Sequence, residues 1–110
     1  MKLIDRNALQ HRLERVTLVE ALPEKYYRDA HLPGARHLPH DQVRELAPRV
    51  LPDRDAEIVV YCASSTCQNS HVAAKVLGQM GYANVAVYAG GKQDWQEAGL
   101  PVEQGTSVAA

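Results

Sequence analysis

Residues 58–70 read Ile-Val-Val-Tyr-Cys-Ala-Ser-Ser-Thr-Cys-Gln-Asn-Ser, a run that changes from apolar to small polar residues. Its first four residues are apolar or aromatic and mostly β-branched, which predicts a buried strand that ends at Tyr61. A small polar loop follows, and Cys62 is its first residue. We expect a helix to open near Ser70, so that loop N–H groups and the positive end of that helix face one sulfur. Such an arrangement stabilises a thiolate or a bound anion.

The segments on both sides of this stretch alternate short apolar runs with helical patterns. Strands are predicted at 17–19 and 85–88, and an extended piece is predicted after a turn at 32–35. Helices are predicted at about 6–15, 23–29, 42–46 and 71–80, and a last helix passes through Trp95 and stops at Gly99. This alternation is typical of an α/β domain with a mostly parallel sheet.

Helix ends are assigned from their capping residues. Asp5, Asp41 and Ser70 are predicted N-caps, because short polar side chains accept hydrogen bonds from the first free N–H groups of a helix. Gly81 is predicted to end the fourth helix in the left-handed conformation. Pro48 is interpreted as part of an exposed connection. The predicted apolar face of the fourth helix consists of Val72, Ala73, Val76, Leu77 and Met80.

Length and composition fit one domain, which we place at residues 1–103, followed by a flexible tail at 104–110. The formal net charge of -1 gives no reason to expect nucleic acid or a membrane surface as a partner. The charged first 20 residues lack the apolar core of a signal peptide, and no stretch approaches the length of a membrane span. We expect a cytoplasmic protein, and its oligomeric state stays open.

Four separated motifs resemble the single-domain rhodanese-like sulfurtransferase family. They are residues 31–35 (His-Leu-Pro-Gly-Ala), 59–62 (Val-Val-Tyr-Cys), the Ala73-Ala74 helix ending in Gly81-Tyr82, and Gly90-Gly91 with Asp94-Trp95. The resemblance covers about residues 1–103. It implies a five-stranded parallel sheet with helices on both faces and an active-site cysteine at the carboxyl end of the central strand. It also implies a persulfide on that cysteine, a sulfur donor, an acceptor such as cyanide or a thiol, and no cofactor.

The residue that matches this cysteine is Cys62, our predicted catalytic nucleophile. Ligands of open α/β sheets bind outside the carboxyl ends of the strands, which supports this role independently. We predict a thiolate that forms below the ordinary pKa of about 8.5. The alternative is a small buried core residue. The residues predicted to contact the substrate are Ala63, Ser64, Ser65, Thr66, Gln68 and Asn69.

The loop departs from the family pattern, because residues 63–69 contain no cation where the family has an arginine, and the loop is about two residues longer. Phosphatases and arsenate reductases of related fold need an arginine six positions after the nucleophile, and that position is Gln68. We therefore disfavour both of those activities and question the use of thiosulfate, a dianion. Arg28 or Lys92 is the alternative source of a cation. Glu20 keeps an acid that the family carries upstream, and its role stays unassigned.

Cys67 follows Cys62 by five positions, and two interpretations stay open. It is either a second catalytic thiol, which resolves a persulfide or sulfenate on Cys62, or a residue that packs against the sheet. A structural zinc site needs four ligands, and this region offers three at irregular spacing, Cys62, Cys67 and His71. We therefore predict no metal.

Two functional classes follow for the whole protein. The first is a thiol sulfurtransferase that carries sulfur on Cys62. The second is a catalytically silent module that binds a partner or senses redox state through Cys62 and Cys67. His31 is interpreted as a turn-stabilising residue, and Tyr88 and Trp95 as core.

Overall fold

A computed structural model describes residues 2–105 and contains one five-stranded sheet in the order β1-β5-β4-β2-β3. All neighbouring strands are parallel, which confirms the predicted fold class. The strands are β1 (Lys2–Leu3), β2 (Thr17–Glu20), β3 (Arg36–His37), β4 (Glu57–Tyr61) and β5 (Asn84–Tyr88). β4 is therefore the central strand, and the loop that begins at Cys62 follows its carboxyl end.

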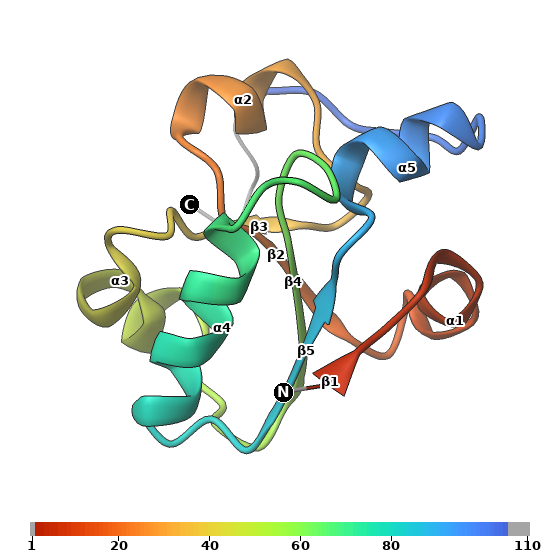
Figure 1. Cartoon of the computed structure of the whole chain (residues 1–110). Coiled ribbons are helices and arrows are strands. Elements are labelled where there is room, and N and C mark those ends of the chain that lie inside the picture. The colour runs from red at the N-terminus through yellow and green to blue at the C-terminus, as the bar shows by residue number, and fades with distance from the viewer. Residues whose placement is uncertain (1, 106–110) are drawn as a thin grey trace.

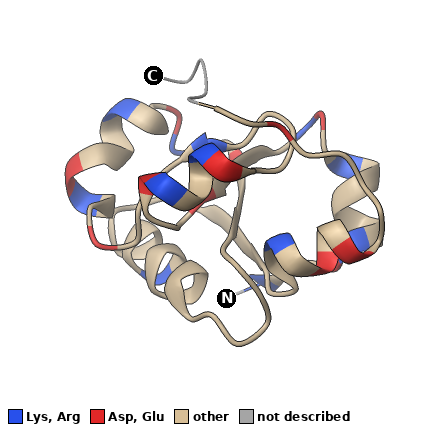
Figure 2. Ribbon diagram, turned by 90° about the horizontal axis from the view of Figure 1, so that it is seen from above, with Lys and Arg blue, Asp and Glu red and all other residues tan. Residues whose placement is uncertain are grey.

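Helices cover both faces of this sheet, as predicted. They are α1 (Arg6–Arg12), α2 (Glu24–Asp29), α3 (Val43–Val50), α4 (Asn69–Gln79) and α5 (Gly91–Glu97). Figure 1 shows α3 and α4 on one side of the sheet and α1 and α5 on the other, with α2 at the end where β4 runs into its loop. Figure 2 shows basic and acidic residues interspersed along the helices instead of gathered by sign.

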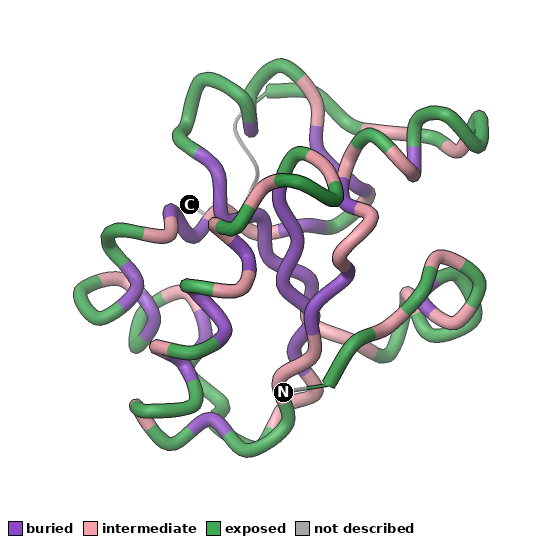
Figure 3. The backbone as a smooth tube through the Cα atoms, in the orientation of Figure 1, coloured by how far each residue is buried: buried purple, intermediate pink, exposed green. Residues whose placement is uncertain are grey.

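Alternate side chains of β4 belong to two separate hydrophobic cores. Ile58 and Val60 pack with residues of α3 and α4, whereas Val59 and Tyr61 pack in the cluster that contains Leu9 of α1. The buried central strands are visible in Figure 3. Complete burial of an aliphatic side chain of this size contributes about 1.5–3 kcal/mol, so the central strand is strongly held in this register.

Two predicted helix ends are confirmed and one helix is shorter than expected. Asp5 caps α1, since its carboxylate accepts a hydrogen bond of 2.8 Å from the Ala8 N–H. Gly81 follows α4 with a φ of 97°, the left-handed conformation predicted for it. α1 ends at Arg12 instead of near residue 15.

The predicted α3 was wrong at both ends. Its N-cap position is Gln42 instead of Asp41, and the helix continues through Pro48 to Val50. Proline removes one internal hydrogen bond, but the last turn has tertiary support. Tyr82 Oη donates to the carbonyls of Ala47 and Leu51 at 3.2 and 2.6 Å, and these contacts hold the carboxyl end of the helix.

The amino-terminal edge strand and one helix face also differ from the sequence prediction. β1 was not predicted, because two residues carry no periodicity, and it pairs through Lys2 with Ala86 and through Leu3 with Val87. Val72 is 44% exposed, so it does not belong to the buried face of α4. The residues of α4 that are buried are Ser70, Ala73, Ala74 and Leu77.

The carboxyl-terminal segment closes against the turn that follows α2. His31 and Glu103 exchange two backbone hydrogen bonds of 2.9 and 2.8 Å, and the Gly105 N–H donates to the Arg28 carbonyl at 2.9 Å. Residues 106–110 of the expected tail lie outside the described residues. Within residues 2–105, no helix is long and apolar enough to cross a membrane.

Candidate functional site

Cys62 lies directly after β4, at the carboxyl edge of the sheet, and is only 1% exposed. Its thiol donates hydrogen bonds to the Cys67 carbonyl at 3.3 Å and to the Ser70 hydroxyl at 3.4 Å. The sulfur is therefore enclosed by its own loop and by the first turn of α4. This is the edge at which parallel α/β sheets bind their ligands.

Burial raises the pKa of the Cys62 thiol, and a hydrogen bond to Cys67 adds to this effect, although contacts from Ser70 act in the opposite direction. The predicted low pKa of Cys62 is therefore wrong. The prediction assumed that the loop N–H groups converge on Cys62. In the folded protein the loss of water around the sulfur outweighs the few donors that reach it.

Cys67 is half-buried, and loop N–H groups act on its sulfur. Partial burial tends to raise its pKa, but hydrogen bonds from the Cys62 thiol and the backbone N–H groups of Ala63 and Asn69 lower the pKa overall. Both cysteines are free thiols. The more acidic thiol of the pair is thus Cys67, which is also the more exposed one.

Ser70 does not cap α4 as predicted. The helix begins two residues earlier, and the N-cap position is Gln68, whose side chain makes no capping hydrogen bond. Ser70 is buried in the first turn, where its hydroxyl accepts from Cys62. A capping serine and a serine that contacts the thiol have the same sequence signature, so only the fold distinguishes them.

The predicted substrate-contacting residues form a surface turn above Cys62. The Cys67 N–H donates to the Ser64 carbonyl at 3.1 Å, and the hydroxyls of Ser64 and Thr66 lie 3.1 Å apart. The exposed members of this turn are Ala63, Ser65, Thr66 and Gln68, and the half-buried ones are Ser64 and Asn69. The turn carries hydroxyl, amide and backbone donors but no charge.

The start of α5 anchors the first two residues of the loop. The Lys92 N–H donates to the Cys62 carbonyl at 2.9 Å, and the Gln93 N–H donates to the Ala63 carbonyl at 2.8 Å. Gly91 permits this approach, since a Cβ at that position would lie 2.6 Å from the Cys62 carbonyl oxygen. Its φ of 69° also lies in the region that favours glycine. This contact explains Gly91, whereas a Cβ at Gly90 would lie 2.8 Å from Cβ of Asp94.

Glu20 is fully buried behind the loop and forms a network that sequence reasoning did not assemble. Tyr61 Oη donates to Glu20 Oε1 at 2.7 Å, and Lys92 Nζ lies 3.1 Å from the same oxygen. Burial raises the pKa of Glu20 despite these contacts, and it raises that of Tyr61 well above its usual value. This network could be recognised only from the strand pairing, because Glu20 and Tyr61 are partners in the β2–β4 register.

A shallow hollow of about 400 Å³ adjoins the loop at Ala63. Lys92 is among the residues that line it, and its ammonium is held by Glu20 and by the Tyr26 carbonyl at 2.9 Å. The side chains that complete its lining are Leu22, Tyr26, Gln93, Gln96 and Glu97. The predicted cation from outside the loop is therefore near the site, but a buried carboxylate balances its charge.

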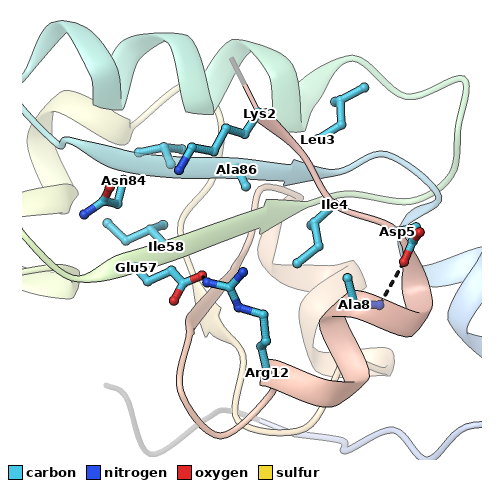
Figure 4. A pocket seen from close by; sticks show the side chains of 11 residues that line it. Lys2, Leu3, Ile4, Asp5, Ala8, Arg12, Glu57, Ile58, Asn84 and Ala86 are labelled. Carbon is cyan, nitrogen blue, oxygen red and sulfur yellow. Dashed lines mark hydrogen bonds and ion pairs between the residues drawn. The ribbon is translucent and has the colours of Figure 1, made fainter.

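A second hollow, of about 450 Å³, lies at the opposite end of the strands, where Glu57 begins β4 and Asn84 begins β5 (Figure 4). Arg12 of α1 points toward Glu57 in this view and forms an ion pair with it. No residue of the 62–70 loop lines this hollow. It is therefore separate from the cysteine site.

Aromatic and histidine side chains near the site have the structural roles that we expected. The His31 ring is buried and stacks on Tyr27 with centroids 4.0 Å apart. Trp95 is buried, and its indole N–H donates to the Pro101 carbonyl at 2.7 Å. Across residues 2–105, no three His, Cys, Asp or Glu side chains come together in a group that could hold a metal ion.

Fold and site together define a parallel α/β domain with a cysteine loop at the carboxyl end of its central strand. The model of the rhodanese-like domain family matches residues 5–98, and the chain belongs to this family. Its fold superimposes on a thiosulfate sulfurtransferase from Pseudomonas aeruginosa with a TM-score of 0.82 and 26% identity, over 96% of this chain and 20% of that one.

Two curated relatives have different functions. The chain is 34% identical over 93 residues to an HTH-type transcriptional regulator of Mycobacterium tuberculosis, a match that covers 84% of this chain and 40% of the regulator. It is 34% identical over 73 residues to the thiosulfate sulfurtransferase PspE of Escherichia coli, and this match covers 66% of each protein. The chain thus spans less than half of the regulator. Both an enzyme and a regulator are therefore among its relatives.

Proposed function

We propose that this protein is a thiol sulfurtransferase that carries sulfane sulfur as a persulfide on Cys62. The observation that carries this proposal is the position of Cys62 at the carboxyl end of the central strand, enclosed by its own loop and the first turn of α4. Membership of the rhodanese-like family and the match to PspE support the same activity.

The transfer consists of two thiol exchanges. The sulfur of Cys62 bonds to the sulfane sulfur of a donor R–S–SH while the donor S–S bond breaks, and the Cys62 proton leaves with R–SH. An acceptor thiolate then attacks the outer sulfur on Cys62, and Cys62 departs as a thiolate. Neither step consumes an oxidant or a reductant.

The charge of the loop favours a persulfide over thiosulfate as the donor. Thiosulfate is a dianion, and residues 63–69 offer it no cation. The ammonium of Lys92 is already paired with the buried carboxylate of Glu20. Because pairing leaves no net positive charge there, a donor that carries less charge should bind more readily.

A load-and-chase experiment tests this function. The protein is incubated with a persulfide donor, the donor is removed, and intact-mass and peptide analysis should find one reducible extra sulfur on Cys62. Addition of a thiol should release that sulfur. Cys62→Ser should lose sulfur transfer to the acceptor thiol, and transfer at the wild-type rate by this folded variant would overturn the proposal. Thiosulfate should load the wild type poorly, and efficient saturation at low concentration would contradict the donor assignment.

The second candidate is a redox-sensing or partner-binding module without turnover. The match to the mycobacterial transcriptional regulator favours it. In that case the chain takes up no sulfur from any donor, while the thiols of Cys62 and Cys67 still respond reversibly to oxidants. The same mass analysis therefore separates the two candidates.

A further inference from the structure

The two thiols of the loop differ in how accessible they are. Cys62 is 1% exposed, and its carbonyl is bonded to the start of α5. Cys67 is half-buried and lies in the outer part of the loop, among exposed residues. A donor larger than hydrosulfide therefore meets Cys67 first.

The two residues are also in direct contact. The Cys62 thiol donates to the Cys67 carbonyl at 3.3 Å, and each thiol shifts the pKa of the other. The Cys67 N–H is bonded to the Ser64 carbonyl, and this turn folds Cys67 back over the strand end. Sulfur on one residue is thus within reach of the other.

We propose that Cys67 is the thiol that takes sulfur from the donor and that it relays this sulfur to Cys62. This relay rests on the proposed sulfurtransferase function and adds a second catalytic residue to it. The donor class is a persulfide whose organic group is too large to reach the enclosed Cys62.

The relay balances without any further reactant. The thiolate of Cys67 attacks the outer sulfur of R–S–SH, a Cys67–S–SH forms, and R–S⁻ leaves as the donor S–S bond breaks. The sulfur of Cys62 then bonds to the outer sulfur, the bond to Cys67 breaks, and the proton lost from Cys62 protonates the departing sulfur of Cys67. The products are Cys62–S–SH and the free thiol of Cys67.

The acidity of the two thiols favours this direction. The pKa of Cys67 is lowered by hydrogen bonds from Cys62 and the loop N–H groups, although its partial burial acts against them, whereas burial raises the pKa of Cys62. A more acidic thiol is more often ionised for the first attack and is the better leaving group in the second. Sulfur therefore enters on Cys67 and is stored on Cys62.

Rapid quenching with an alkylating agent, followed by peptide mapping, tests the order of loading. A persulfide of glutathione serves as the bulky donor. In wild-type protein the extra sulfur should appear on Cys67 before Cys62, and in Cys62→Ser it should appear on Cys67 alone. In Cys67→Ser the loading of Cys62 should slow by at least about tenfold. Val72→Ala, on the exposed side of α4, is the matched control and should load as the wild type does.

The outcomes separate the relay from the function on which it rests. If Cys67→Ser loads Cys62 at the wild-type rate, the relay is wrong while the sulfurtransferase stands. If neither cysteine of the wild type takes up sulfur, the function itself fails. A small donor, the hydrodisulfide anion, gives a further check, because it should load Cys67→Ser with a smaller defect than the glutathione persulfide.

Discussion

Gly91 is the residue at which the backbone of the site is most crowded. Replacement by alanine adds a Cβ 2.6 Å from the Cys62 carbonyl oxygen and 2.9 Å from the Ser64 nitrogen. We expect Gly91→Ala to destabilise the protein by about 2–4 kcal/mol, because a left-handed conformation and a backbone clash both add to the cost. Denaturant unfolding measures this change.

Gly99 provides the matched control for that substitution. It has a similar φ of 76°, but nothing lies within 4 Å of an added Cβ. Gly99→Ala therefore incurs the conformational cost alone, of about 1–2 kcal/mol. Equal losses in the two variants would show that the contact with the Cys62 loop does not contribute.

Oxidation of the cysteine pair is a second property of individual residues. We predict that mild oxidant joins Cys62 and Cys67 in a disulfide that blocks sulfur transfer until a thiol reductant restores it, provided the loop brings the Cα atoms within about 7 Å. Because Cys67 is the more exposed and more acidic thiol, it should form the sulfenic acid first and then condense with Cys62. Peptide mapping should find the disulfide. Irreversible oxidation of Cys62 beside a free Cys67 would contradict this order.

Among the elements, α1 and α3 show what a capping side chain contributes. Asp5→Ala removes the acceptor of the Ala8 N–H and should cost about 1 kcal/mol. Asp41→Ala is the control, since Asp41 precedes the N-cap position of α3 and is exposed. Thermal or denaturant unfolding compares the two, and equal losses would contradict the assignment of the caps.

Elements with strong local signals could be predicted from the sequence. The β4 run, the Asp5 cap and the Gly81 stop each depend on residues within one turn or strand. Other features needed contacts from distant segments. Pro48 is helical because Tyr82 holds the end of α3, and β1 exists because it pairs with β5.

The same distinction applies to the candidate site. The position of Cys62 at a strand end could be predicted, because the strand and the loop after it are both marked by neighbouring residues. The acidity of its thiol could not be predicted, because burial and the direction of each loop N–H are set only in the folded chain. Likewise, Glu20 meets Lys92 across 72 positions of sequence, and no local pattern marks that contact.

For the whole molecule, the buried Glu20 predicts how stability depends on pH. Burial raises its pKa above the ordinary value of 4.5, although Tyr61 and Lys92 act against this rise. The folded protein therefore binds the Glu20 proton more tightly than the unfolded chain does. Its contribution to the unfolding free energy is present below pH 4.5 and falls as the pH rises through the raised pKa.

Comparison with Glu20→Gln isolates this effect, because the amide keeps the size of the side chain but does not titrate. The unfolding free energy of the wild type minus that of the variant should decrease with rising pH in the window above 4.5, and then become constant. Denaturant unfolding over a pH series measures the difference. A difference that increases with pH would show that Glu20 has a lowered pKa in the folded protein.

The anchoring of the loop by α5 also gives the protein a built-in reporter. The amide protons of Lys92 and Gln93 are held by the carbonyls of Cys62 and Ala63, so their exchange with deuterated solvent depends on whether the loop is closed. An added sulfur atom on the enclosed Cys62 has to displace part of that loop. The exchange rates of these two amides, read by nuclear magnetic resonance, should therefore be higher in the sulfur-loaded protein than in the sulfur-free protein.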